Sequence, residues 1–334
     1  MKKTIACAAI LSALMGAFAA PMLETVENSH FRMTVDPLGA RITSLFSKDA
    51  GVDFTVPGSP GLFTESSWDR WHSRGKLAKT VFDMEVGRKD GAFSVSAMGQ
   101  GSGVIPFMRV GKRYSSVPES TALTVEYSFI NAPDAMSLQA YSPCIHLSLA
   151  MEGRIVSFCY ADAEGMHRRG QNEGSSMRTE TPMRGWYAAV DRKGEVGAVI
   201  TVPYEWLHGF SAWLPGVPSS EIKLLPVGIE NGEAFKVKLE LIPFKGLAFV
   251  SGAGGGLVGS LGGGVCKVVN SRAGRVVAEH DGIKTVLDFD RPGALRSFET
   301  SATQVRLLPP SPSHLLTILV AKPEKGKWSL EPEC

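Results

Sequence analysis

A short segment in the first quarter of the chain combines the side-chain types with which proteins bind sugars. Tryptophan rings pack on the apolar C–H faces of a sugar, and carboxylates and guanidinium groups form hydrogen bonds with its hydroxyls. The predicted ligand-binding residues of this segment are Glu65, Trp68, Asp69, Trp71 and Arg74. His72, between them, is a candidate acid–base catalyst. The alternative is a surface loop whose tryptophans cover the edge of the core.

A second aromatic-rich segment runs from Tyr204 to Trp213. Aromatic loops at the rim of a β-sandwich can line a ligand cleft, so Trp206 and His208 are predicted to contact the same ligand. Core packing is the alternative, which we favour for one of the two tryptophans of this segment.

Two further residues complete the candidate catalytic set. His146 lies within an apolar stretch, where a histidine either faces a cleft or is a satisfied core residue. Glu221 follows two serines and is either a general base or a solvated carboxylate. An enzyme would combine His72 or His146 with Glu65 or Glu221.

No spacing in the sequence predicts a metal or a cofactor. The chain has 5 cysteines, and no two of them form a CxxC motif. Cys144 and Cys159 could form a disulfide or remain as two buried thiols. Gly254–Gly259 matches the glycine pattern of dinucleotide-binding proteins, but more glycines and then strands follow it instead of a helix. We therefore expect no metal and no cofactor.

The charges of the chain and its first residues indicate where it acts. Lys and Arg number 35 against 33 Asp and Glu, so no excess charge attracts nucleic acid or anionic lipid. Residues 1–19 read as a bacterial signal peptide, with two lysines, an apolar run and the small-x-small sequence Ala17-Phe18-Ala19. The run is shorter than the about 20 residues of a membrane span, although a retained anchor is the alternative. We expect an exported protein, periplasmic or secreted, with no membrane span and no nucleic-acid partner.

Period-2 alternation of apolar and polar residues recurs along the chain. It is clear in Phe31–Asp36, Leu123–Phe129 and Phe235–Leu241, and turn sequences separate such segments. Alternation of this kind is typical of antiparallel strands with one buried face. We predict an all-β fold, a long polar loop over Asp162–Arg184, and a linker or tight turn over the glycine-rich Ser251–Gly264.

Three of these segments resemble the galactose mutarotase-like (aldose 1-epimerase-like) superfamily. FRMTVDPLGARITSL, from Phe31 to Leu45, resembles its opening strands. Leu123–Asn131 followed by Asp134 is similar to its central strand and Asn-containing turn, and Phe235–Leu241 is similar to its closing strand. The resemblance implies an antiparallel β-supersandwich over residues 20–250. The glycine-rich segment 251–264 and a small C-terminal β domain over 265–334 would follow.

The resemblance also bears on the site. True mutarotases carry an Asn-His-Ser-Tyr-type motif after the Asn-containing turn, and its His acts in acid–base catalysis. This sequence has Ala140-Tyr141-Ser142-Pro143 there, which places Tyr141 at the sugar cleft and leaves the catalytic His missing. His146 would need a bulge to reach the cleft, whereas Glu221 falls near the superfamily's catalytic carboxylate.

The resemblance implies a carbohydrate ligand. We predict an exported carbohydrate-binding protein, accessory to glycan or polysaccharide use. A carbohydrate-active enzyme, either epimerase-like or a hydrolase or lyase with a His/Glu pair, is one alternative. A non-catalytic interaction protein of the cell envelope is the other.

Overall fold

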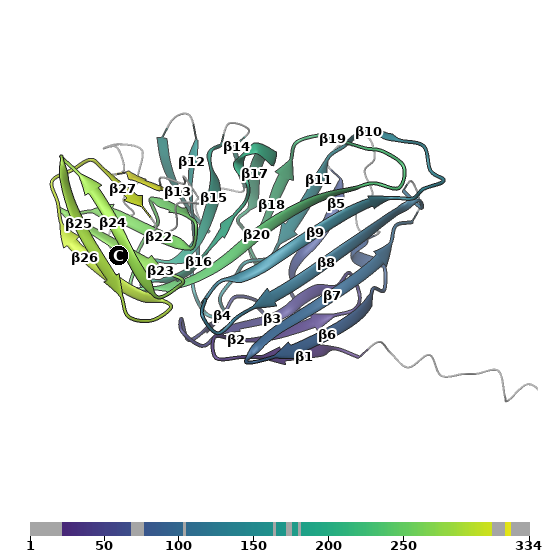
Figure 1. Ribbon diagram of the computed structural model, residues 1–334, viewed down its shortest axis with the longest axis horizontal. Helices are drawn as coiled ribbons and strands as arrows, with labels where there is room; N and C mark the ends of the chain where they lie inside the picture. Colours follow the sequence, from purple (N-terminus) through teal and green to yellow (C-terminus); the bar gives the residue numbers. More distant parts are fainter. Residues whose placement is uncertain are drawn as a thin grey trace, which may run out of the picture.

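The computed structural model describes residues 22–67, 77–102, 105–162, 165–171, 176–179, 182–308 and 318–321. These residues form antiparallel strands and two short 3-10 turns, η1 (Leu77–Lys79) and η2 (Tyr204–Trp206). The predicted all-β class is confirmed (Figure 1). The predicted signal peptide lies outside the described residues. Within them, no helix has the length and apolar character needed to cross a membrane.

The first of two large sheets has the strand order β1-β2-β3-β5-β11-β18-β17-β14, with β4 beside β3. Its strands are β1 (Glu24–Glu27), β2 (Phe31–Asp36), β3 (Arg41–Ser47), β4 (Val52–Asp53), β5 (Leu62–Ser67), β11 (Pro143–Leu147), β14 (Ser176–Thr179), β17 (Leu207–Trp213) and β18 (Ser219–Leu224). Strands β5, β11, β18 and β17 lie side by side although they come from distant parts of the sequence.

The second large sheet has the order β13-β12-β15-β16-β20-β9-β8-β7-β6. Its strands are β6 (Asp83–Lys89), β7 (Ala92–Gln100), β8 (Met108–Ser116), β9 (Leu123–Asn131), β12 (Ser157–Asp162), β13 (Gly165–Gly170), β15 (Pro182–Asp191), β16 (Val196–Thr201) and β20 (Ala234–Lys245). A small pair, β10 (Leu138–Tyr141) with β19 (Val227–Ile229), completes this part of the molecule.

The two large sheets pack face to face on the apolar side of each strand (Figure 1). In β9 every second residue is buried, from Leu123 to Asn131, because successive side chains of a strand point to opposite faces. Tyr187 of the second sheet and Phe210 of the first meet in this core, with ring centroids 5.1 Å apart. Burial of one such side chain contributes about 1.5–3 kcal/mol, so the shared core holds the sandwich together.

A smaller β unit follows the sandwich. One sheet contains β21 (Gly252–Gly254), β22 (Leu257–Gly262), β23 (Val265–Asn270) and β26 (Ala294–Glu299), and the other contains β24 (Gly274–His280), β25 (Ile283–Phe289), β27 (Gln304–Leu308) and β28 (Ile318–Ala321). The unit has its own apolar core between these sheets. The small C-terminal β domain is thus present (Figure 1).

The glycine-rich segment Ser251–Gly264 forms β21 and β22, with a tight turn at Gly255 and Gly256 between them. Both turn glycines have positive φ, 52° and 83°, which other residues adopt with strain. The glycines therefore shape a hairpin that belongs to the C-terminal unit.

The predicted long loop over Asp162–Arg184 is wrong. Strands β13 and β14 and the start of β15 fall within this range. β13 and β14 lie at the edges of the two large sheets, and edge strands commonly carry polar and charged residues that discourage pairing with another chain. Edge strands of this composition look like loops in a sequence.

Candidate functional site

His146 and Glu221 are cross-strand neighbours in the first sheet, on β11 and β18. His146 Nδ1 lies 3.6 Å from Glu221 Oε1, and the side chains are 34% and 37% exposed. Residues that face each other across an antiparallel ladder share a face of the sheet. The two candidate catalytic residues of the strands therefore lie together on the open face of the first sheet.

A serine hydroxyl contacts each of these two side chains on the side that faces away from the other. Ser66 Oγ on β5 lies 2.6 Å from His146 Nε2. The Ser211 hydroxyl on β17 donates to Glu221 Oε2 over 2.9 Å, and Lys223 Nζ is 3.8 Å from the same oxygen. The imidazole and the carboxylate are thus oriented by neighbours on both sides.

A bulge in the partner strand β5 lies next to His146. His146 pairs with Thr64 and Leu147 with Leu62, so Phe63 is the extra residue of β5. Phe63 has a φ of +62°, a left-handed conformation that is strained for a bulky residue. Beyond the bulge, the ladder between β5 and β11 continues with Leu62 opposite Leu147.

Cys144 and Trp213 lie on the same face of the first sheet, and Cys144 is buried there with 2% of the residue exposed. Cys144 precedes His146 by two residues on β11, and its Sγ is within 4.8 Å of the ligand atoms of His146 and Glu221. Trp213 follows Ser211 by two residues on β17 and is 54% exposed. Neither residue was predicted at the site, nor were Ser66, Ser211 and Lys223. Their alternation with His146 and Glu221 is visible in the sequence only once the pairing of the strands is known.

Glu65 lies on the opposite face of β5, between the two large sheets. It is fully buried and forms an ion pair with the equally buried Lys112 of β8. Burial raises the pKa of Glu65 above its ordinary value, and the charge of Lys112 opposes this shift. The expectation that Glu65 contacts a ligand does not fit this position, because Glu65 lies in the core on the opposite side of the first sheet from His146 and Glu221.

The remaining predicted residues lie elsewhere. Tyr141 is fully buried, and its ring packs against Phe129 at 5.6 Å, so the core occupies the place expected for a ligand. Trp206 packs edge-on against Phe235 at 5.0 Å, with 37% of the residue exposed. His208 is half-buried at an irregularity in the pairing of β17 with β18.

Five predicted residues cannot be placed. They are Trp68, Asp69, Trp71, His72 and Arg74, which lie outside the described residues. Their proposed roles stay predictions.

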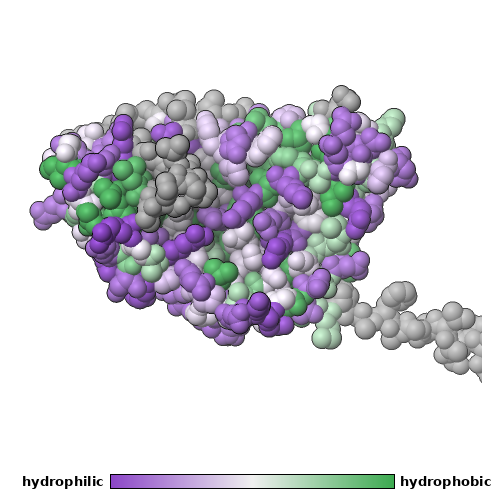
Figure 2. Space-filling model, in the orientation of Figure 1, coloured by the Kyte–Doolittle hydropathy of each residue, from purple (hydrophilic) through white to green (hydrophobic). Residues whose placement is uncertain are grey.

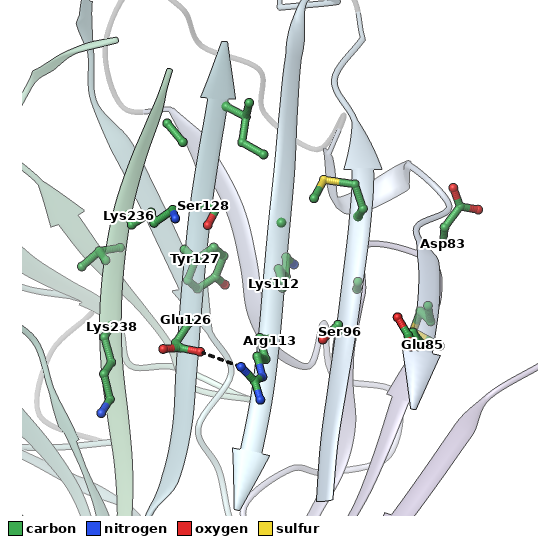
Figure 3. A pocket seen from close by; sticks show the side chains of 17 residues that line it. Asp83, Glu85, Ser96, Lys112, Arg113, Glu126, Tyr127, Ser128, Lys236 and Lys238 are labelled. Carbon is green, nitrogen blue, oxygen red and sulfur yellow. Dashed lines mark ion pairs between the residues drawn. The ribbon is translucent and has the colours of Figure 1, made fainter. Parts of the chain in front are cut away.

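A second candidate is a hollow of about 850 Å³ on the second sheet (Figure 3). Strands β6, β7, β8, β9 and β20 line it with small residues such as Ser96 and Ser128 and with charged ones such as Lys236. The aromatic ring of its lining belongs to Tyr127, which is buried and donates its hydroxyl to the Phe63 carbonyl over 3.0 Å. Because Tyr127 is buried, the described lining of the hollow has no exposed aromatic plane. Hydrophilic residues are spread over this view of the molecule (Figure 2).

Comparison with known proteins finds similarity at the level of structure. No protein-family model and no curated protein sequence matches the chain. The structure of a galactose mutarotase related enzyme from Lactobacillus acidophilus is similar with a TM-score of 0.50 at 11% identity, over 68% of this chain and 98% of that chain.

Two further structures are of the same kind. A galactose mutarotase-like protein from Lactobacillus casei gives a TM-score of 0.48 at 10% identity, over 66% of this chain and 100% of that one. Galactose 1-epimerase from Lactobacillus acidophilus NCFM gives 0.49 at 10% identity, over 66% and 94%. The first similarity, to the galactose mutarotase related enzyme, confirms the predicted supersandwich. At this identity it shows the fold alone, since one fold hosts many activities.

Proposed function

Because the chain has the galactose mutarotase-like supersandwich fold, we propose that it binds carbohydrate on the open face of the first sheet. The bound sugar lies over His146 and Glu221, and the protein serves as an exported accessory to glycan use. The observation that carries this proposal is that this pair and the exposed ring of Trp213 lie on the same face of the neighbouring strands β11, β18 and β17.

Sugar recognition needs a flat apolar surface next to hydrogen-bonding groups of both kinds. Trp213 and Ser211 are alternate residues of β17, and Ser211 contacts Glu221, so all three lie on one face. The ring of Trp213 offers the plane on which the C–H face of a sugar packs. Among the described residues, the lining of the hollow in the second sheet has charges but no exposed aromatic ring, and for this reason we place the ligand on the first sheet.

The polar groups of the open face match a ring of hydroxyls. The Glu221 carboxylate accepts hydrogen bonds, the Lys223 ammonium donates them, and the His146 imidazole does either according to its protonation. Their contacts with one another, at 3.6 and 3.8 Å, are longer than strong ion pairs. A sugar hydroxyl beside either pair can therefore form hydrogen bonds with both of its members.

The test is calorimetric titration of the purified protein with a panel of neutral, amino and acidic mono- and oligosaccharides. We expect one sugar class to bind and Glu221→Gln to weaken its binding at least about tenfold, since hydrogen bonds to a charged group contribute about 1.5–3 kcal/mol. Glu126→Gln, in the hollow of the second sheet, is the matched control and should bind normally. A protein that binds no sugar of the panel, or a Glu126→Gln variant that alone loses binding, contradicts the proposal.

An epimerase-like activity is the second candidate, and the 3.6 Å separation of His146 and Glu221 favours it. Opening of a sugar ring needs a base to take the proton of the anomeric hydroxyl and an acid to protonate the ring oxygen. A His/Glu pair can supply both roles. Polarimetry would reveal this activity as an accelerated mutarotation of the sugar. His146→Gln and Glu221→Gln should each abolish the acceleration. Sugar binding without acceleration would leave the binding function alone.

Export rests on the first nineteen residues of the sequence. Expression of the whole chain in a bacterial host should give a processed product that starts at Ala20, measured by mass spectrometry of the intact protein. Ala19→Arg should block this processing, because signal peptidase requires a small residue there. An unprocessed wild-type protein in the cytoplasm would contradict export and leave the sugar site untouched.

A further inference from the structure

Cys144, His146 and Glu221 bring three metal-ligating side chains to one place on the first sheet. One ligand atom of each lies within 4.8 Å of the ligand atoms of the other two. We propose that they bind one divalent transition-metal ion, with Zn²⁺ as the preferred ion. This inference does not depend on the proposed function, because ion binding is measured without sugar.

The strand ladder fixes the positions of the three residues. Cys144 and His146 are alternate residues of β11 and share a face, and Glu221 is the direct partner of His146 on β18. A tetrahedral Zn²⁺ has bonds of about 2.0–2.3 Å, which separate its ligand atoms by roughly 3.3–3.8 Å. The 3.6 Å between His146 Nδ1 and Glu221 Oε1 is already within that range. Rotation of side chains alone can therefore complete the site.

Outer partners orient two of the three ligands. His146 Nε2 is 2.6 Å from Ser66 Oγ, and an Nε2–H that donates there puts the lone pair of the imidazole on Nδ1, the atom that faces Glu221. Ser211 donates to Oε2 of Glu221, which leaves Oε1 for the ion. Metal-binding histidines and carboxylates commonly have such hydrogen-bonded partners, which fix the tautomer and the orientation. Ser66 is only 4% exposed, so its position is well defined.

The chemistry of the donors selects the ion. A thiolate, an imidazole and a carboxylate are the three ligand types that Zn²⁺ takes in proteins. Sulfur and nitrogen donors disfavour Ca²⁺ and Mg²⁺, which prefer oxygen. The thiolate and the carboxylate together balance the double charge of the ion. Three protein ligands leave a fourth position for water or for a ligand hydroxyl, on the side where His146 and Glu221 are exposed.

The experiment uses Co²⁺ as a spectroscopic substitute for Zn²⁺ in the full chain after treatment with a chelator. We expect one Co²⁺ per protein, a thiolate-to-metal charge-transfer band in the near ultraviolet, and intense visible bands of a tetrahedral ion. Zn²⁺ should displace it. Cys144→Ala should remove the charge-transfer band, and Glu221→Gln should weaken binding at least about tenfold. Cys266→Ala, which removes a buried thiol of the C-terminal unit, is the matched control and should keep the band.

Ser66→Ala tests the outer partner. It should lower the affinity about 10–100-fold while the thiolate band of the bound ion persists. Circular dichroism shows whether each variant folds. If Cys144→Ala does not fold, X-ray absorption of the Zn²⁺-loaded wild type decides, because it reports whether one sulfur and several nitrogen or oxygen atoms surround the ion.

The proposal is overturned if Co²⁺ binds without a thiolate band, if Cys144→Ala retains the band, or if no ion binds. A protein that binds sugar but no Co²⁺ would overturn the metal site alone. A protein that binds Co²⁺ but no sugar would overturn the proposed function alone.

Discussion

Lys112 Nζ lies 2.5 Å from Glu65 Oε2, and both side chains are completely buried between the two large sheets. The ammonium also donates to the backbone oxygens of Gly39 and Phe63. Burial lowers the pKa of Lys112, while the charge of Glu65 opposes that shift. Glu65 pairs with Ile145, the neighbour of His146 on β11, so this ion pair ties the strands of the candidate site to the second sheet.

Lys112→Met should destabilise the protein by about 3–5 kcal/mol, because it leaves the Glu65 carboxylate buried without its counter-ion. Chemical denaturation measures this loss. The double variant Lys112→Met/Glu65→Leu should recover most of it, since no charge then remains in the core. Lys238→Met, at a largely exposed lysine of β20, is the control and should change stability by less than about 0.5 kcal/mol. A single variant as stable as the wild type would show that the ion pair is not needed for the fold.

Trp213→Ala should weaken binding of the sugar at least about fivefold, because stacking of an aromatic ring contributes about 0.5–1.5 kcal/mol beyond its buried area. The fold should survive, since the side chain is largely exposed. Trp206→Ala is the matched control. Its ring packs on Phe235, so its loss should lower the free energy of unfolding and leave sugar affinity unchanged. Titration calorimetry measures the sugar affinity of both variants and of the wild type. If Trp213→Ala binds the sugar as tightly as the wild type, the ligand does not contact Trp213.

The strands of the sandwich could be predicted because alternation is a local property. Phe31–Asp36 and Phe235–Leu241 show in the sequence the period of two that their burial follows in the structure. Asp162–Arg184 could not be assigned in this way. Edge strands keep one polar side toward water, and their polar composition is shared with loops.

The candidate site was predicted in its residue types but not in its arrangement. His146 with Glu221 was one of several possible His/Glu pairs, and the contact between them depends on the pairing of β11 with β18, which no local pattern reveals. Glu65 illustrates the opposite case. Its sequence neighbours are polar and predict an exposed segment. In the structure Glu65 is buried in the core, where it forms an ion pair with Lys112 of a distant strand.

Stability should fall as the pH rises from about 9 to about 11, and Cys159 should account for part of the loss. Burial raises the pKa of the Cys159 thiol from 9.0 to about 11. Between these values the unfolded chain loses the proton and the folded protein keeps it, so rising pH favours unfolding. The effect approaches about 3 kcal/mol for two pKa units. Urea denaturation of wild type and Cys159→Ala at both ends of this range measures it. Identical pH dependence in the two proteins would contradict the prediction.

Gly185→Ala should destabilise the second sheet by about 1–3 kcal/mol or more, because the new Cβ would lie 2.1 Å from the backbone oxygen of Val202. Val202 directly follows β16, and its amide donates a hydrogen bond to the Gly185 carbonyl. Because this bond ties the two backbones together, neither can move away without losing it. Gly87→Ala is the control. Its Cβ would lie 2.8 Å from the hydroxyl of Ser94, which can rotate aside. Thermal denaturation should show a clear loss for Gly185→Ala and a small change for Gly87→Ala, whereas equal melting temperatures would mean that β15 and β16 are less tightly apposed than their hydrogen bonds indicate.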